Sequence, residues 1–248
     1  MKLGLISDIH EDYENLSRAA TVLEKSQVTE LICLGDITGY SSVNYNAGNG
    51  RNAEKCIRFV QSNCTYTVAG NHDLYTVRKT PLYNAGFKYP DLWFSIQVKE
   101  RKKLSGESLW YYEDEDPGEI SDELKEYLAS LPEFIILSLS GIKISLSHYF
   151  YPDLTGSTVF FPSRAKQLNG HFKFMKDHSA DISFSGHGHY EGLFRASEKR
   201  IHLVRKGVHA VGNFPVAFSI PCIARGKQKN GICIFDTNER TIETIILS

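Results

Sequence analysis

Short apolar runs alternate with polar, periodic stretches along the first half of the chain. The runs are too short for buried helices and are followed by Gly, Ser, Asn or Asp, a pattern that indicates strands. Five of these predicted strands are 2–6, 31–34, 66–69, 142–146 and 182–184. Polar stretches with a helical period lie between the early runs, which predicts β-loop-α units and a sheet that contains parallel strands.

Apolar periodicity places helices at Asp12–Lys25, at Asn52–Ser62 and around Asp122–Leu131. The second half of the chain is richer in strands. Ser140-Gly141 and the segment 236–240 each separate two apolar runs, and this spacing predicts two hairpins, 134–139 with 142–146 and 231–235 with 241–247.

Residues that can bind metal ions follow directly after the five predicted strands. Taken singly, each segment is more often an ordinary turn, because Gly, Asn and Asp are common turn residues. In open α/β sheets, however, the loops at the carboxyl ends of the strands converge on one crevice, where ligands bind. The combination therefore predicts one site. Its segments are Asp8-Ile9-His10, Gly35-Asp36, Gly70-Asn71-His72-Asp73, Ser147-His148 and Gly186-His187-Gly188-His189.

His187 and His189 form the most specific pair. They are two residues apart, so on an extended backbone their imidazoles point to one face and reach the same pair of ions. The chain has nine histidines, and four of them lie outside the five segments. These four are expected to be structural or surface residues: His171, His178, His202 and His209.

The five motifs, in this order, resemble those of the calcineurin-like metallophosphoesterase superfamily, and in particular the small bacterial and archaeal phosphodiesterases of the YfcE and MJ0936 type. Residues 35–40 are similar to the Gly-Asp-x-Val-Gly-Tyr of that group, and residues 124–132 resemble its helix before the second half. The resemblance spans almost the whole chain. It implies an α/β fold, a four-layer αββα sandwich of two mixed β-sheets flanked by helices. Residues 1–248 would form a single domain, with room for a cap-like insertion at about 80–120.

The resemblance also implies a role for each motif residue. Two divalent metal ions would be bound, and Mn, Fe, Zn, Ni and Co all suit oxygen and nitrogen ligands without thiolate. A hydroxide held between the two ions would attack phosphorus in line with the leaving group. One ion would be bound by Asp8, His10 and His189, the other by Asn71, His148 and His187, and Asp36 would bridge them.

His72 is not a ligand in this scheme. It is placed to stabilise the transition-state charge or to protonate the leaving oxygen. Its orienting partner is not identified by the motifs, and Asp73 is the nearest candidate. The catalytic residues expected from the sequence are therefore His72 and Asp73. The substrate-binding residues stay unknown.

Four positions depart from the wider family. Gly39 and Tyr40 replace the Asp and Arg of the Ser/Thr protein phosphatases, which argues against that branch. Gly188 replaces the usual Thr, so the loop with the last two ligands is expected to be less rigid. Glu11 replaces a Gly, and it is expected to face solvent at a helix start rather than to repel anionic substrates at the mouth of the site. The loop at 219–222 also differs from the Asn-Pro-Gly-Ser of the relatives.

Two stretches are candidates for shaping a pocket. Thr80–Leu104 is aromatic and is expected to be helical. Ser105–Ile120 contains Trp110-Tyr111-Tyr112 followed by the acidic run Glu113–Asp116. Either this second stretch is a cap that selects the leaving group, or it is a solvated surface loop whose aromatic side chains pack on the core.

Composition agrees with this picture and narrows the partners. A chain of 248 residues with 42% hydrophobic residues can fill one sizeable core. The net charge of −1 gives no overall attraction to nucleic acid, and the basic residues of the last quarter, such as Arg195, Arg225 and Lys227, are expected to be exposed surface charges. The five cysteines suggest no disulfide framework, and Cys33 and Cys233 are expected in the core.

These observations favour a cytoplasmic, binuclear-metal-dependent phosphodiesterase or phosphatase that acts on a phosphoester small molecule or nucleotide. No signal peptide or membrane segment is expected, because no apolar run is long enough. Nucleic acid is disfavoured as a partner, and the oligomeric state is open, with a homodimer as one alternative. A non-catalytic scaffold with the same fold and a nuclease or phosphoprotein phosphatase are the competing hypotheses.

Overall fold

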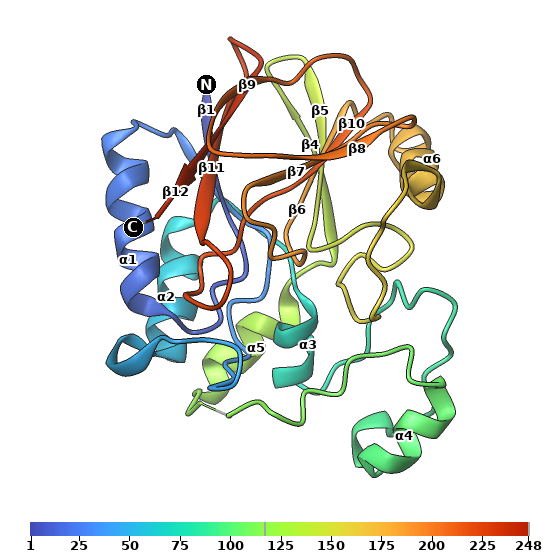
Figure 1. The fold of residues 1–248 in the computed structure, drawn as a ribbon. Coiled ribbons are helices and arrows are strands. Elements are labelled where there is room, and N and C mark those ends of the chain that lie inside the picture. Colours follow the sequence, from blue (N-terminus) through green and yellow to red (C-terminus); the bar gives the residue numbers. More distant parts are fainter. Residues whose placement is uncertain (117, 248) are drawn as a thin grey trace.

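Two six-stranded sheets face each other at the centre of the molecule, and helices cover both outer sides (Figure 1). The computed structural model describes residues 1–116 and 118–247. Helices α1 (Tyr13–Lys25) and α2 (Ala53–Asn63) lie outside the first sheet, and α6 (Asn169–Asp177) lies outside the second. This arrangement is the four-layer αββα sandwich of two mixed sheets that was expected from the sequence.

The first sheet combines a parallel and an antiparallel half. Strands β1, β2 and β3 are parallel, whereas β11 pairs with β1 in the antiparallel direction. Across this sheet the order is β3 (Tyr66–Thr67), β2 (Glu30–Cys33), β1 (Lys2–Ile6), β11 (Gly231–Asp236), β12 (Thr241–Ile246) and β9 (Gly207–Ala210).

The second sheet has a parallel centre. Strands β5, β6 and β10 run parallel, and β4 and β7 flank them in the antiparallel direction. Across this sheet the order is β4 (Phe134–Leu139), β5 (Ile142–Ser147), β6 (Ile182–Ser185), β10 (Val216–Ser219), β7 (Leu193–Ala196) and β8 (Ile201–Val204).

Shorter helices surround one end of the sheets. Helix α3 (Asn71–Thr76) and α5 (Asp122–Ser130) pack against each other, while α4 (Val98–Ser105) lies at the margin of the molecule (Figure 1). Three 3-10 turns complete the helical elements: η1 (Gly48–Gly50), η2 (Trp93–Ser95) and η3 (Ala165–Leu168).

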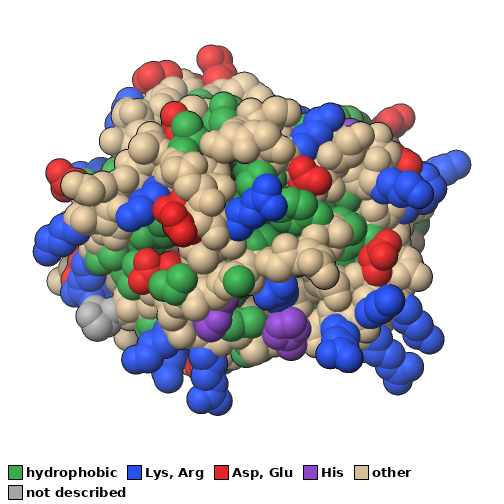
Figure 2. Space-filling view, turned by 90° about the horizontal axis from the view of Figure 1, so that it is seen from above, with side chains coloured by type: hydrophobic (Ala, Val, Ile, Leu, Met, Phe, Trp, Pro, Cys, Tyr) green, Lys and Arg blue, Asp and Glu red, His purple; other side chains and the backbone are tan. Residues whose placement is uncertain are grey.

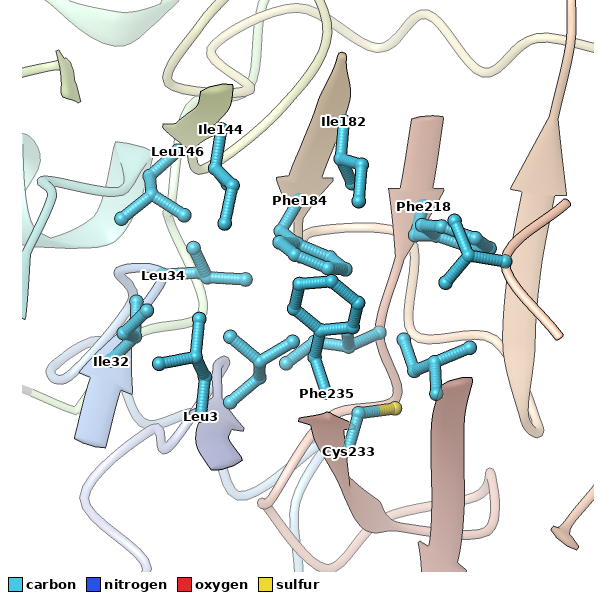
Figure 3. Close-up of a cluster of buried hydrophobic side chains, with 14 of the residues drawn as sticks. Leu3, Ile32, Leu34, Ile144, Leu146, Ile182, Phe184, Phe218, Cys233 and Phe235 are labelled. Carbon is cyan, nitrogen blue, oxygen red and sulfur yellow. The ribbon is translucent and has the colours of Figure 1, made fainter. Parts of the chain in front are cut away.

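The main core lies between the two sheets. Side chains from β1, β2 and β11 point toward side chains from β5, β6 and β10 (Figure 3). Phe235 of the first sheet and Phe184 of the second meet with ring centroids 5.4 Å apart, and both are fully buried. Because each strand alternates its side chains between two faces, the opposite faces pack on the helices. The result is one continuous scaffold that fixes the two sheets relative to each other.

Most of the predicted elements are confirmed within a residue or two. The three predicted helices correspond to α1, α2 and α5, and both predicted hairpins form, as β4–β5 and β11–β12. One helix prediction is confirmed only in part: within Thr80–Leu104 the structure has η2 and all of α4 except its last residue, whereas residues 80–92 are irregular. The aromatic residues there pack on one another, as Phe87, Tyr89 and Trp93 do, and this packing does not require helical spacing.

Charged groups are dispersed over the face that is seen from above. Lys and Arg are spread around the rim of this face, and Asp and Glu lie among them (Figure 2). One member of the basic group near the C-terminus, Arg225, is paired internally: its Nε lies 2.8 Å from Asp12 Oδ2 and its Nη1 lies 3.0 Å from Glu14 Oε2. That side chain therefore holds the start of α1 and is not free to contact a nucleic acid.

Cys33 and Cys233 are buried and free, as expected. In the part of the chain that the structure describes, none of the helices combines the length and apolar character needed to cross a bilayer.

Candidate metal centre

The predicted ligands come from both sheets and meet where the parallel strands end. Asp8 and His10 follow β1, Asp36 follows β2, and Asn71 follows β3 at the start of α3. From the second sheet, His148 follows β5, and His187 and His189 follow β6. The carboxyl ends of the parallel strands of both sheets thus open on the same side, and all seven side chains converge there.

Most of these ligands have an unusual backbone. Positive φ angles occur at Asp8 (54°), His10 (43°), Asp36 (53°), His187 (62°) and His189 (46°). Residues other than glycine rarely adopt this left-handed conformation, and when they do they cluster at functional sites. The prediction that His187 and His189 lie on extended backbone is therefore wrong. Each of the two has a left-handed backbone, and their side chains belong to different groups of candidate ligands.

The side chains form three overlapping groups that could each hold a metal ion. Asp8, His10 and His189 make the first group, and Asp36, His148 and His187 make the second. The third group, His10, Asp36 and His72, joins the other two; within each group the candidate ligand atoms lie within 4.8 Å of one another. His189 Nε2 is 3.1 Å from Asp8 Oδ1, and His148 Nε2 is 3.0 Å from Asp36 Oδ2. His10 Nε2 lies 3.9 Å from Asp8 Oδ1 and 4.0 Å from Asp36 Oδ2, so it stands between the groups.

Backbone carbonyls orient two of the imidazoles. His10 Nδ1 donates to Gly39 O at 2.9 Å, and His148 Nδ1 donates to Leu34 O at 2.6 Å. A carbonyl only accepts, so Nδ1 carries the proton in both rings and Nε2 faces the carboxylates. This is the arrangement typical of metal-binding histidines, whose second nitrogen is held by a hydrogen bond outside the site.

The amide of Asn71 completes the second group of side chains. One end of this amide is hydrogen-bonded to the Tyr112 hydroxyl at 3.0 Å. The other end faces the cluster, 3.1 Å from His187 Nδ1, 3.3 Å from His148 Nε2 and 3.3 Å from Asp36 Oδ2. From this position a carboxamide can offer its oxygen to a metal ion.

Electrostatics supports the same conclusion. Burial raises the pKa of Asp8, but the imidazoles of His189 and His148 outweigh it and hold that pKa well below its usual range. Burial lowers the pKa of His10 to about 3, so this imidazole is neutral. Burial also lowers the pKa of His148, but Asp36 and Asp8 outweigh it and raise the pKa to about 9. A metal ion would bind the ionised carboxylates and displace the His148 proton.

His72 lies at the edge of this cluster, with its Nε2 4.0 Å from Asp36 Oδ2. Its Nδ1 is hydrogen-bonded to Glu115 Oε1. Burial lowers the pKa of His72, but the carboxylates of Asp36 and Glu115 outweigh it and raise that pKa above its usual value. The prediction that Asp73 orients His72 is therefore wrong, and sequence reasoning did not identify Glu115. The only signal was the acidic run 113–116, which lies far from the motif in sequence.

Asp73 instead organises the loop that follows β2. Its Oδ1 accepts from the backbone N–H groups of Ile37 and Thr38 and from the Thr38 hydroxyl, at 2.9 to 3.1 Å. Its Oδ2 accepts from Gly70 N at 3.1 Å. The carboxylate is fully buried and ties the second motif to the third. This contact keeps Asp36 and Asn71 next to each other.

Packing corrects the expectation for Glu11 and shows what surrounds Gly188. Glu11 does not face solvent: only 2% of it is exposed, its Oε1 accepts from Gly39 N at 3.2 Å, and its Oε2 accepts from Arg51 Nε at 2.7 Å. It stabilises the loop that contains Gly39, whose carbonyl oxygen accepts a hydrogen bond from His10. The Tyr190 ring occupies the space beside Gly188, and a Cβ at position 188 would collide with it. That ring stacks on Phe194 at 4.8 Å, so the loop is supported although the Thr is absent.

A cavity of about 380 Å³ opens over the cluster. Part of its lining is formed by the candidate site residues Asp36, Asn71, His72, His187 and His189. A second part of the lining comes from the stretch 105–120, which contributes Trp110, Tyr112, Asp114 and Glu115. That stretch therefore borders the pocket, although Pro117 within it lies outside the described residues. The four histidines outside the motifs do not line this cavity: His171, His178, His202 and His209.

The fold and these groups of candidate ligands are typical of phosphoesterases that use metal ions. Residues 1–191 match the model of the calcineurin-like phosphoesterase family, and the chain belongs to that family. It is a metal-dependent phosphoesterase, in agreement with the resemblance of its motifs.

Individual relatives are distant. The uncharacterized protein MJ0912 of Methanocaldococcus jannaschii is 23% identical over 253 residues, which cover 98% of this chain and 86% of that protein. A metallophosphoesterase from Sphaerobacter thermophilus has 17% identity and a TM-score of 0.67, with 100% of this chain and 88% of that one covered. The hypothetical protein PH1004 from Pyrococcus horikoshii has 12% identity and a TM-score of 0.60 with the same coverage. These two structures share the fold.

Proposed function

We propose that this protein hydrolyses a small-molecule phosphoester with two divalent metal ions bound side by side. The observation that carries the proposal is the pair of ligand groups, with Asp36 and His10 between them and with Nε2 of His10 and His148 turned inward. Asp8, His10 and His189 would hold one ion, and Asn71, His148 and His187 would hold the other. Asp36 would bridge the two. Mn, Fe, Zn, Ni and Co all remain candidates, because the ligand types suit each of them.

When bound, two such ions neutralise the phosphoryl oxygens and lower the pKa of the attacking water. The residues of the chain provide the rest. The backbone carbonyls behind His10 and His148 keep the inward-facing nitrogens in place, so little reorganisation is needed when substrate arrives. No serine or cysteine nucleophile is required, because water supplies the attacking oxygen.

His72 would act on the substrate directly. It lines the cavity beside Asp36 and Asn71, with 19% of its side chain exposed. From this place it can donate a hydrogen bond to a phosphoryl oxygen or a proton to the leaving oxygen. We propose His72 as the catalytic residue that is not a metal ligand.

The pocket favours a small substrate. A volume of about 380 Å³ falls in the range of small-molecule sites. Lys227 is the only Lys or Arg among the described residues that line it, whereas Asp114 and Glu115 add negative charge. A polyanion such as nucleic acid would need a row of cationic contacts along its backbone. We therefore favour a phosphodiester or phosphomonoester of a single small molecule, nucleotides included, over a nucleic acid.

Metal content and hydrolysis test this function together. We expect purified protein to bind two divalent ions per chain and to hydrolyse bis-p-nitrophenyl phosphate or p-nitrophenyl phosphate with Mn²⁺, Ni²⁺, Co²⁺ or Zn²⁺. The Asp36→Asn variant should lose metal and activity, because it removes the shared carboxylate. The rate ratio of diester to monoester then assigns the preferred ester.

The control is Asp177→Asn, the same substitution at an exposed residue of α6 that pairs with Lys173. It should keep the metal content and rate of the wild type. Protein that binds no metal and hydrolyses neither ester with any of these ions would contradict the proposal and would favour the scaffold hypothesis.

A further inference from the structure

A segment outside the motifs supplies one side of the site. This segment, residues 108–116, is called the arm below. Its first residues are hydrogen-bonded to the segment 157–159: Trp110 N donates to Ser157 O at 3.1 Å, and Val159 N donates to Ser108 O at 3.0 Å. At its other end, Asp116 N donates to Tyr40 O at 2.9 Å. The arm is thus attached at both ends across the cavity.

The side chains of the arm alternate between two directions. Trp110, Tyr112 and Asp114 line the cavity. Tyr111 is hydrogen-bonded to Ser105 of α4, and Glu113 forms an ion pair with Lys102 of the same helix. The outward residues therefore contact α4, while the inward residues face the candidate ligands. The side chains of Lys102 and Glu113 are 40% and 53% exposed, so their ion pair contributes little to the position of the arm, which its backbone hydrogen bonds fix at both ends. Tyr112 adopts a φ of 56°, a conformation that costs energy and is retained where the surroundings fix it.

Glu115 is the arm residue that meets His72. Its side chain is only 10% exposed, and its Oε1 is hydrogen-bonded to His72 Nδ1. The contact depends on Gly39, because a Cβ at that position would collide with the His72 ring. In this chain the motif leaves that space to the ring, and the carboxylate comes from the arm.

The other contacts of His72 leave its second nitrogen available. Tyr112 packs edge-on against the ring at 4.8 Å, and His10 packs on it at 4.8 Å. Nε2 is the nitrogen that faces Asp36, at 4.0 Å from Oδ2. A carboxylate at Nδ1 fixes both the tautomer and the orientation of an imidazole. Only Nε2 is then presented to a substrate.

We propose that Glu115 is the positioning residue of His72, so that the catalytic pair is complete only when the arm is in place. The inference rests on the proposed function, since it assigns to Glu115 a role in the same hydrolysis. It adds that Glu115, on the inward side of the arm, takes part in the hydrolysis, so the arm does more than form a wall that selects the leaving group.

The test compares two glutamates of the arm. In Glu115→Ala, kcat for the better ester should fall by about 100-fold, the lower end of what acid–base catalysis contributes. KM and the metal content should stay within about threefold of the wild-type values, because the metal ligands are intact. Glu115→Gln keeps an oxygen that accepts from Nδ1 and should recover part of the lost kcat. The matched control, Glu113→Gln, removes the outward ion pair and should retain the wild-type kcat.

A double-mutant cycle with His72→Ala separates positioning from general damage. If Glu115 acts through His72, the double variant should be no slower than His72→Ala alone. The loss in Glu115→Ala should also be larger for an ester with a poor leaving group, such as phenyl phosphate, than for p-nitrophenyl phosphate, if His72 protonates the leaving oxygen. Additive losses, or equal losses in Glu113→Gln and Glu115→Ala, would overturn the inference.

NMR of the imidazole nitrogens distinguishes this inference from the proposed function. The Nδ1 proton of His72 should be protected from exchange in the wild type and in Glu113→Gln, and it should be lost in Glu115→Ala. An active enzyme in which Glu115→Ala leaves kcat and this signal unchanged refutes the positioning role alone. A wild type that binds no metal and turns over no ester refutes the proposed function, and the catalytic role of Glu115 with it.

Discussion

At the scale of single residues, the candidate ligands combine metal-binding side chains with an unusual backbone conformation. Asp8, Asp36 and His187 occur in ordinary Gly- and Asp-containing turns, and each adopts a positive φ that an L-residue seldom takes. The energy cost of such a conformation is met by neighbouring hydrogen bonds, for example from His187 N to Asp8 Oδ2 at 3.0 Å. The ligands thus hold one another in place before a metal ion arrives.

The buried carboxylate of Asp73 holds the loop after β2 next to the start of α3. In Asp73→Asn, one of the two oxygens is replaced by an NH₂ group that must face a donor, either Gly70 N or the group at Ile37 and Thr38. We expect the free energy of unfolding to fall by about 1–3 kcal/mol, the cost of leaving buried donors unsatisfied. Urea denaturation monitored by circular dichroism measures this loss.

The comparison for that variant is again Asp177→Asn. Asp177 pairs with Lys173 on the exposed side of α6, with 54% of its side chain in solvent. Exposed pairs of this kind contribute at most about 0.5 kcal/mol. Equal stability of the two variants would show that Asp73 does not organise the loop after β2.

At the scale of elements, α1 illustrates how a helix start is tied to a remote segment. Asp12 caps the helix, because its Oδ1 accepts from Asn15 N at 3.1 Å. The same carboxylate accepts from Arg225, through Nη2 at 2.8 Å and through the backbone N–H at 3.0 Å. The helix therefore begins at Tyr13, and the cap also fastens the loop that follows β10 beside the first ligands.

Two cap variants separate these contributions. Asn52→Ala removes the cap of α2, where Oδ1 accepts from Lys55 N at 2.8 Å in an exposed place. A loss of about 1 kcal/mol is expected there. Asp12→Ala should lose about 1–2 kcal/mol more, because it also removes three hydrogen bonds from Arg225 and leaves that side chain with Glu14 as its remaining carboxylate. Thermal and urea denaturation measure both losses, and equal values would show that the contact to Arg225 contributes nothing.

The irregular stretch before α4 marks the limit of element prediction. Its aromatic residues satisfy one another by edge-to-face packing, as Phe87 and Tyr89 do at 4.9 Å. Such contacts do not depend on a helical period, so composition alone did not reveal the local structure. The hairpin β4–β5 was easier to predict from the sequence, because the Ser140-Gly141 turn and the alternation of apolar and polar residues in its strands both indicate a hairpin.

At the scale of the whole molecule, the site depends on the packing of two sheets. Asp8 and Asp36 belong to the first sheet, whereas His148 and His187 belong to the second. The core that surrounds Phe184 and Phe235 therefore sets the spacing of the ligand groups (Figure 3). Stability and metal affinity should respond to the same core substitutions.

Phe235→Ala tests this coupling. Removing a fully buried phenyl ring should lower the free energy of unfolding by about 3–5 kcal/mol. Because the sheets can shift across the cavity that remains, metal affinity should fall as well. Calorimetric titration with Mn²⁺ measures that change. In Phe160→Ala, where 40% of the residue is already exposed, both quantities should change little. A Phe235→Ala variant that is destabilised but binds metal as tightly as the wild type would contradict the coupling.

The sequence by itself determined the elements and the identity of the candidate ligands. Strands followed by Asp, Asn and His carry a local signal, and β-strand ends in an α/β sheet converge by topology, so Asp8, Asp36 and His148 could be named without coordinates. The order of the motifs also indicated the family. These features depend on residue type and short spacing, which a sequence records directly.

Only the tertiary structure decided how the site is completed. Glu115 lies 43 positions from His72, and a long irregular segment brings the two together, so no local pattern could pair them. The burial of Glu11 and the filling of the space beside Gly188 by Tyr190 likewise depend on which surfaces meet after folding. Contacts between remote segments arise from packing and from the need to satisfy buried polar groups, and neither can be read from neighbouring residues in the chain.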